Sequence, residues 1–183
     1  MLLIEEFKNF ILTIKEEDNI AIFYHKMCVD GLCSAIIVSK SIERITKIKP
    51  KFHIPSEHEI NDNTIEFIKT NKIKKIIFID LLPCRYPEKL EAIGRLAKVM
   101  IVDHHKFNLD NIPSNILFFH AEYFKPELDG VDYPASKLAF DLFSQMCNIS
   151  DLDWISGMGL IADMGYKTWK NFVMDFQKNI SGI

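Results

Sequence analysis

Short apolar runs alternate along the first two thirds of the chain with segments in which apolar residues recur every three or four positions. Four runs rich in β-branched and aromatic residues predict buried strands at residues 19–25, 74–80, 99–105 and 115–123. Helices are expected from Asp30 to Arg44 and, bounded by proline, from about Tyr86 to Ala97. Continuous apolar strands that alternate with helices are typical of a parallel sheet covered on both faces.

Both ends of the chain show the helical period. Near the N-terminus, the apolar residues on one helical face predict an amphipathic docking helix rather than a signal peptide: Leu3, Phe7, Phe10, Ile11 and Ile14. The last third predicts one helix after Pro134 and two more, from about Asp151 to Tyr166 and from Thr168 to Lys178. We therefore expect an α/β fold, with a doubly wound, mainly parallel sheet, helices on both faces and a helical C-terminal part.

Length, charge and cysteine content favour a single domain that lies in the cytoplasm and does not associate with membranes. A chain of 183 residues, 48% of them apolar, can build one well-packed domain, which we place at residues 1–183. The net charge of −3 argues against gripping duplex nucleic acid by phosphate neutralisation alone, although bound metal ions would add local positive charge. Four cysteines without a CxxC pair indicate a reduced, cytoplasmic protein. No apolar run approaches the ~20 residues that span a membrane, so no membrane association is expected.

Three predicted strands end in ionisable residues. The first ends in His25, the second in Asp80, and the third in Asp103, His104 and His105. A lone aspartate after a strand is most often a helix cap, and a lone histidine is more often a surface or core residue. However, ligands of such sheets bind at the carboxyl ends of the strands, where these side chains would meet. Imidazole and carboxylate together suit Mn, Fe, Co or Zn better than Ca.

Four segments resemble the motifs of the DHH phosphoesterase superfamily in order and spacing. They are His25–Gly31, Phe78–Asp80, Val102–His105 and Gly159–Gly165, and the resemblance runs from about residue 20 to residue 166. The superfamily includes RecJ-type exonucleases, oligoribonucleases, cyclic-dinucleotide phosphodiesterases, exopolyphosphatases and family II inorganic pyrophosphatases. The resemblance therefore implies a metal-dependent phosphoesterase.

The resemblance also implies a set of site residues. One divalent cation would be held by His25 and Asp80, and a second by Asp30, Asp80, His104 and Asp163, with Asp80 bridging the two. The expected ion is Mn, with Mg, Co, Zn or Fe as alternatives.

Two further roles follow from the same resemblance. His105 would face the scissile phosphate and either donate a hydrogen bond to a phosphoryl oxygen or protonate the leaving group. For Asp103 two interpretations stay open, a carboxylate that orients a ligating histidine and a plain helix or turn cap.

Two features depart from the common family pattern. Cys28 stands where the first motif usually has an aspartate, as in a His-x-x-Cys-x-Asp-Gly variant of the motif. Cys28 either ligates a metal as thiolate, leaves its position to water, or is a small packing residue. In addition, only about twenty residues follow Asp163, so the usual C-terminal lobe that clamps substrate is expected to be absent.

Two functions are compatible with this pattern. The first is hydrolysis of a phosphodiester or phosphoanhydride, in a short single-stranded oligonucleotide or a phosphorylated, nucleotide-like small molecule, by two-metal activation of water. The alternative is a non-catalytic subunit or scaffold in a nucleic-acid-processing complex. In either case a partner chain or a second copy could complete the cleft. The remaining histidines show no metal spacing and are interpreted as structural or surface residues: His53, His58 and His120.

Overall fold

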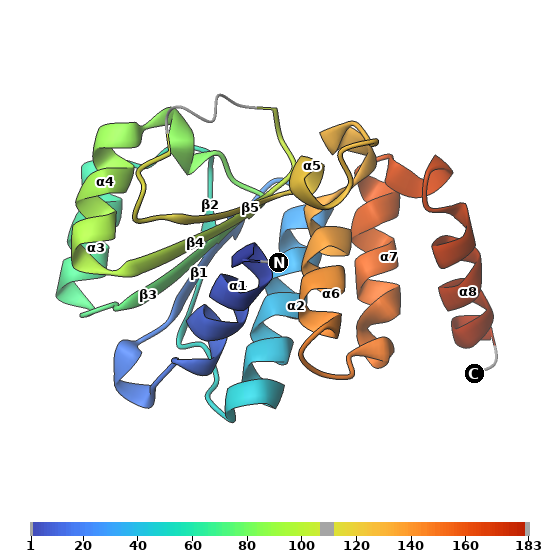
Figure 1. Cartoon of the computed structure of the whole chain (residues 1–183), viewed down its shortest axis with the longest axis horizontal. Helices are drawn as coiled ribbons and strands as arrows, with labels where there is room; N and C mark the ends of the chain where they lie inside the picture. Colours follow the sequence, from blue (N-terminus) through green and yellow to red (C-terminus); the bar gives the residue numbers. More distant parts are fainter. Residues whose placement is uncertain (1, 107–111, 182–183) are drawn as a thin grey trace.

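The computed structural model describes residues 2–106 and 112–181, and within them the chain builds one parallel sheet of five strands with helices on both faces (Figure 1). The strands are β1 Ala21–His25, β2 Phe52–Ser56, β3 Lys75–Ile79, β4 Lys98–Asp103 and β5 Leu117–His120. Their order across the sheet is β2-β1-β3-β4-β5, and every pair is parallel. The predicted α/β fold with a mainly parallel sheet is confirmed.

The helices divide between the two faces of the sheet. The described α-helices are α1 Leu2–Leu12, α2 Val29–Thr46, α3 Asp62–Thr70, α4 Pro87–Leu96, α5 Ala121–Phe124, α6 Ala135–Ser144, α7 Asp153–Ala162 and α8 Lys170–Ser181. Helices α3 and α4 cover one face, and α1, α2 and α6 cover the other, with α7 and α8 farther out (Figure 1). None of the described helices is long and apolar enough to cross a membrane.

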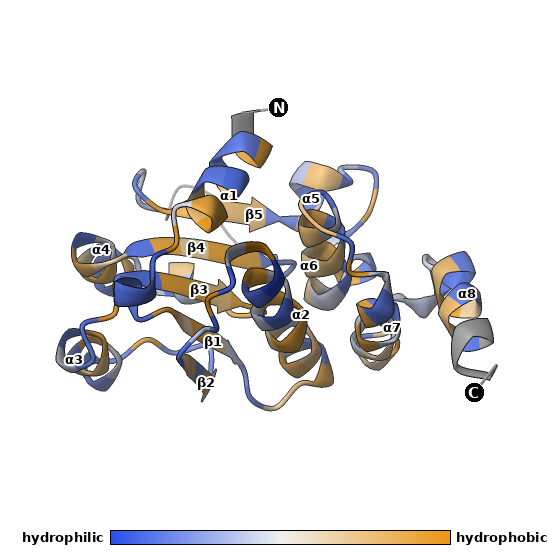
Figure 2. Ribbon diagram, turned by 90° about the horizontal axis from the view of Figure 1, so that it is seen from below, coloured by the Kyte–Doolittle hydropathy of each residue, from blue (hydrophilic) through white to orange (hydrophobic). Residues whose placement is uncertain are grey.

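Each central strand feeds both cores. In β3, Ile76 and Phe78 pack beneath α3 and α4, whereas Ile77 and Ile79 pack against the helices on the opposite face. Successive side chains of a strand point to opposite faces, so a strand covered on both sides must be apolar throughout. Figure 2 shows this as mostly hydrophobic colouring along β3 and β4. Because these strands are buried on both faces, their sequences are continuous apolar runs, from which the strands could be predicted.

The sequence analysis missed β2 and α3. Strand β2 alternates half-buried and exposed residues and pairs only with β1 among the described strands, so it is an edge strand. It contains Pro55, which an edge strand tolerates because one side of its backbone needs no ladder partner. The predicted fourth strand is shorter than expected, because His120 caps α5 by accepting a hydrogen bond from the backbone N–H of Glu122.

The strand order creates a topological switch point at the carboxyl edge of the sheet. The chain leaves β1 through α2 on one face, and it leaves β3 through α4 on the other. Two neighbouring strands whose following helices depart to opposite faces open a gap beyond their carboxyl ends, and ligands of such sheets bind there. His25 ends β1, and Asp80 directly follows β3. The topology therefore brings both residues to the switch point.

Replacing Phe7 by alanine should lower the free energy of unfolding by about 3–5 kcal/mol, because the ring is fully buried and packs edge-on against Phe119 and Phe143. The matched control is Leu12→Ala in the same helix, where the side chain is 64% exposed and the change should stay within about 0.5 kcal/mol. Urea unfolding followed by circular dichroism measures both values. Similar small changes in the two variants would show that α1 does not dock on the sheet.

Candidate metal centre

The first motif forms the link between β1 and α2. Cys28 caps α2, with its sulfur accepting a hydrogen bond from the backbone N–H of Asp30 at 3.3 Å. The next residue, Gly31, lets the helix start lie directly against the site. A Cβ atom at Gly31 would lie 2.6 Å from the carbonyl oxygen of His25 and 2.9 Å from Oδ2 of Asp80. The close approach of helix and strand therefore requires glycine at this position.

Asp30 is fully buried and joins α2 to α6. Its Oδ2 accepts a hydrogen bond from the backbone N–H of Ala135 at 2.8 Å, and its Oδ1 accepts one from Ser136 at 3.1 Å. Both donors belong to the first turn of α6, where a carboxylate is favoured. Burial, and then the nearby charge of Asp80, raise the pKa of Asp30 to about 7. The helix linkage was not predicted from sequence.

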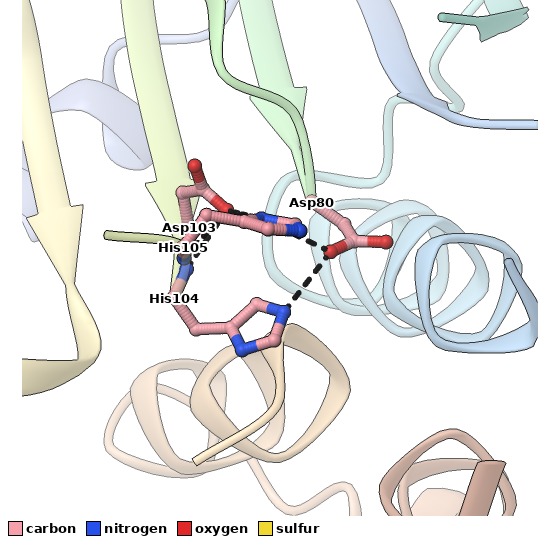
Figure 3. A group of neighbouring side chains, drawn as sticks. All are labelled: Asp80, Asp103, His104 and His105. Atoms are coloured by element: carbon pink, nitrogen blue, oxygen red, sulfur yellow. Dashed lines mark hydrogen bonds and ion pairs between the residues drawn. The ribbon is translucent and has the colours of Figure 1, made fainter. Parts of the chain in front are cut away.

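Asp80 is the point on which the site converges. Its carboxylate is 1% exposed, and its Oδ1 lies 3.3 Å from Nε2 of His104 and 3.8 Å from Nδ1 of His105. Figure 3 shows both imidazoles directed toward it. Its other oxygen, Oδ2, lies 3.7 Å from Nδ1 of His25. Asp80 therefore faces three imidazoles, an arrangement that suits a carboxylate bridging two metal ions.

The backbone of Asp80 has φ of 56°, in the left-handed region. Its N–H donates to the carbonyl of Val102 at 3.0 Å, which holds the residue in this conformation beside β4. Few residues other than glycine adopt this region, and aspartate and asparagine do so most readily. The turn directs the carboxylate toward the three imidazoles.

His104 directs its Nε2 into the site. Its Nδ1 lies 3.1 Å from the carbonyl oxygen of Gly130, which can only accept, so Nδ1 carries a hydrogen and Nε2 faces Asp80 and Asp163. Burial disfavours the charged ring, but the carboxylates of Asp80, Asp30 and Asp103 outweigh burial and raise the pKa of His104 to about 10. The pocket therefore favours a positive charge at this nitrogen.

Unsatisfied buried atoms test whether a metal fits. Among the described residues, four buried side-chain atoms have no hydrogen-bond partner: Nε2 of His104, Oδ2 of Asp80, Oδ2 of Asp103 and Oγ of Ser41. Such atoms are costly unless something else binds them. Two of the four belong to residues that the family resemblance names as ligands. The donor set of imidazole and carboxylate therefore fits a transition-metal cation.

Asp103 orients His105. Its Oδ1 accepts hydrogen bonds from Nδ1 of His105 at 2.8 Å and from the backbone N–H groups of His104 and His105. It contacts the ring of His105 rather than that of His104. From the other side, Nε2–H of His120 donates to the carbonyl of His105 at 2.9 Å. His105 is thus fixed through both its ring and its backbone. Burial works against ionisation of its ring, but Asp103 outweighs burial and raises the pKa of His105.

The structure brings all eight predicted site residues to one edge of the sheet. Within the described chain they form three overlapping groups whose ligand atoms lie within 4.8 Å of one another: Asp80, Asp103, His104 and His105; His25, Cys28 and Asp80; and Asp30, His104 and Asp163. Asp80 and His104 each belong to two groups. Burial, and then the charge of Asp80, raise the pKa of Cys28 and outweigh the backbone hydrogen bonds that lower it, so a thiolate there would need a cation beside it.

Sequence reasoning missed His58. This residue follows β2, and its ring centroid lies 4.4 Å from that of His25 and 5.2 Å from that of His105. Burial and the two neighbouring histidines lower the pKa of His58. His58 could have been identified from the sequence only if β2 had been predicted, because this strand carries the chain to the sheet edge where the four motifs lie.

The motif glycine of α7 also has a steric role. A Cβ atom at Gly159 would lie 2.5 Å from Oγ of Ser136 and 2.7 Å from Oδ1 of Asp30. Helix α7 can therefore pass close to α2 and α6 and place Asp163, its C-cap, at the site.

Comparison with known proteins identifies a matching family and solved structures of similar fold. Residues 19–171 match the family described as DHH family, N-terminal domain. No curated protein matches the chain in sequence. A crystal structure of exonuclease RecJ bound to manganese has a TM-score of 0.68 at 16% identity, covering 88% of this chain and 43% of that one.

Two further structures share the fold. RecJ from Thermus thermophilus in complex with Mn2+ has a TM-score of 0.67 at 15% identity, with 88% of this chain and 24% of that one covered. CDC45 from Entamoeba histolytica has a TM-score of 0.64 at 19% identity, with 98% and 37% covered. The chain thus spans less than half the length of these three structures.

If Asp80 is a metal ligand, replacing it by asparagine should weaken the binding of added manganese roughly 100-fold or more, because loss of a ligand should cost at least as much as loss of a residue that supports one. Asparagine also accepts positive φ, so the backbone turn is retained while the negative charge and one of the two oxygens are removed. Isothermal titration and the metal-dependent rise in melting temperature measure the effect. The control is Asp62→Asn, an exposed aspartate that pairs with Lys89. Equal manganese content in parent and Asp80→Asn would contradict a central role for Asp80.

Proposed function

The chain belongs to the DHH family, and from that premise we propose that it is a divalent-metal-dependent phosphoesterase. Its substrate would be a phosphodiester or phosphoanhydride in a short single-stranded oligonucleotide or a nucleotide-like molecule. The observation that carries this proposal is the convergence of Asp80, His104 and Asp163 on one point, with buried, unpartnered ligand atoms on the first two. A protein that only needed the fold would have no physical reason to keep these atoms unsatisfied.

Two cation positions are proposed. His25 and Asp80 would hold one ion, while Asp30, Asp80, His104 and Asp163 would hold the other. Bound there, two divalent ions would supply charge stabilisation for a phosphoryl group and a nucleophilic water at neutral pH. Manganese is the favoured ion because imidazole and carboxylate ligands suit it, and two structures of similar fold are described as containing it.

His105 is proposed to act on the substrate rather than on a metal. Asp103 accepts the proton of Nδ1, so Nε2 is the nitrogen left to face the phosphate. The side chain of His105 is 32% exposed, whereas that of His104 is 4% exposed, so His105 lies nearer to an approaching ligand. In the protonated ring Nε2–H would donate to a phosphoryl oxygen or to the leaving group.

A non-catalytic subunit in a nucleic-acid-processing complex is the second candidate. The observation that favours it is Cys28, which replaces a carboxylate of the common family motif. In either case we propose that residues 1–183 form a single domain and that a partner chain or a second copy completes the cleft. Turnover by the metal-loaded chain on a panel of short oligonucleotides, cyclic dinucleotides, pyrophosphate and polyphosphate separates the two functions.

Substitution of Cys28 tests whether its sulfur is a ligand. Serine and aspartate are both good helix caps, so Cys28→Ser and Cys28→Asp should keep the start of α2. If sulfur binds a metal with His25 and Asp80, Cys28→Asp should shift preference from zinc toward manganese and raise the manganese-dependent rate. Competition titration of the two ions measures the preference. An unchanged ratio in both variants would leave Cys28 as a cap.

His104 and His105 should differ in the effect of substitution by alanine. His104→Ala should lose metal, because it removes a ligand. His105→Ala should retain metal and lose about 10²–10⁴-fold in turnover, the usual contribution of a positioned acid. Metal analysis and steady-state kinetics on a substrate from the panel give both quantities. Full turnover by His105→Ala would remove its catalytic role, and a metal-loaded parent inactive on every phosphoester would favour the scaffold.

A further inference from the structure

The loop between β2 and α3 brings a fourth imidazole to the candidate centre. Lys26 N–H donates to the carbonyl of Ser56 at 2.9 Å, so β1 and β2 stay paired up to the sheet edge. Two residues later, the ring of His58 is tilted by 34° to that of His25 and lies edge-on to that of His105, at 80°. His58 therefore fills the space between a proposed metal ligand and the proposed acid.

His58 lies on the side of the centre that solvent reaches. The side chains of Asp30, Asp80 and His104 are nearly inaccessible, whereas His25 and His105 are 21% and 32% exposed. His58 is also partly exposed and contacts both of these rings. Three histidine rings therefore lie together on a solvent-exposed side of the buried carboxylates.

One hydrogen bond fixes which nitrogen of His58 can donate. The backbone N–H of Leu82 points at Nδ1 at 3.4 Å, so Nδ1 must be bare to accept it. The neutral ring then carries its hydrogen on Nε2. No group in the described part of the chain accepts a hydrogen bond from Nε2. Leu82 lies two residues after Asp80, so the loop that positions the central carboxylate also sets the tautomer of His58.

We propose that His58 is a substrate-contacting residue whose Nε2–H donates a hydrogen bond to a non-bridging oxygen of the bound phosphoryl group, beside His105. The proposal rests on the phosphoesterase function and extends it to a residue outside the four motifs. The competing explanation is that the ring only packs against His25. An aromatic ring without a donor distinguishes the two explanations.

The decisive variant is His58→Phe, which keeps a ring over His25 and removes the donor. Inorganic phosphate is the probe, and isothermal titration of the manganese-loaded chain is the measurement. Phosphate should bind roughly 10- to 100-fold more weakly, as expected for one lost hydrogen bond to a charged group, with manganese content and melting temperature unchanged. His53→Phe is the matched control, because that exposed histidine bonds Ser39 outside the site, and it should bind phosphate as the parent does.

Two results would overturn the proposal. Phosphate binding by His58→Phe equal to that of the parent would leave His58 as a packing residue. Loss of manganese in parallel with phosphate would mean that His58 acts by positioning His25. Should phenylalanine lower the melting temperature, the comparison of His58→Asn with His58→Ala decides. Tighter phosphate binding by asparagine, which has a donor, supports the proposal, and equal binding overturns it.

The same titration distinguishes failure of the role proposed for His58 from failure of the phosphoesterase function. If the parent binds manganese and phosphate but hydrolyses no ester, the phosphoesterase function is contradicted. The effect of His58→Phe on phosphate binding still tests whether His58 contacts the phosphoryl group. A parent that binds manganese and no phosphate overturns the role of His58 directly.

Discussion

The burial of carboxylates at the carboxyl edge of the sheet is the constraint on which this structure depends. Asp30, Asp80 and Asp103 are each at most 1% exposed, and burial together with the charge of Asp80 raises the pKa of Asp30. Charges removed from water are costly unless hydrogen bonds or opposite charges compensate them. Asp30 is compensated by the first turn of α6, and Asp103 by His105. Within the described chain, one oxygen of Asp80 and one of Asp103 have no hydrogen-bond partner, and the oxygen of Asp80 leaves a position for a cation beside His25.

The surrounding fold makes this burial possible. Helices α2 and α4 depart to opposite faces, so none of the described helices covers the switch point at the carboxyl ends of β1 and β3. Gly31 and Gly159 allow α2 and α7 to lie close to this edge, because a side chain at either position would overlap the site. Asp30 serves both purposes, since it ties α6 to α2 and also faces the proposed metal. Stability and function are therefore coupled through one buried carboxylate.

At 15–19% identity, the two RecJ structures and the CDC45 structure share this fold with the chain. An apolar strand covered on both faces tolerates exchange among Ile, Val and Phe as long as volume is kept, so the architecture outlasts most of the sequence. The ligand residues have no such freedom, because metal coordination depends on the chemistry and position of individual atoms. Cys28 is therefore the departure from the family motif with the largest expected chemical consequence, since it places sulfur instead of oxygen beside the proposed metal position.

The sequence by itself determined the α/β fold and the set of polar side chains at the strand ends, because buried parallel strands and motif spacing are local patterns. It did not determine β2, since an edge strand that contains Pro55 is buried on one side only and lacks the continuous apolar run. His58 was lost with that strand. Only the tertiary structure decided that Asp30 caps a helix 105 residues away, and that His120 donates to the backbone carbonyl of His105. Hydrogen bonds between distant segments depend on how the elements pack, and no local pattern encodes that packing.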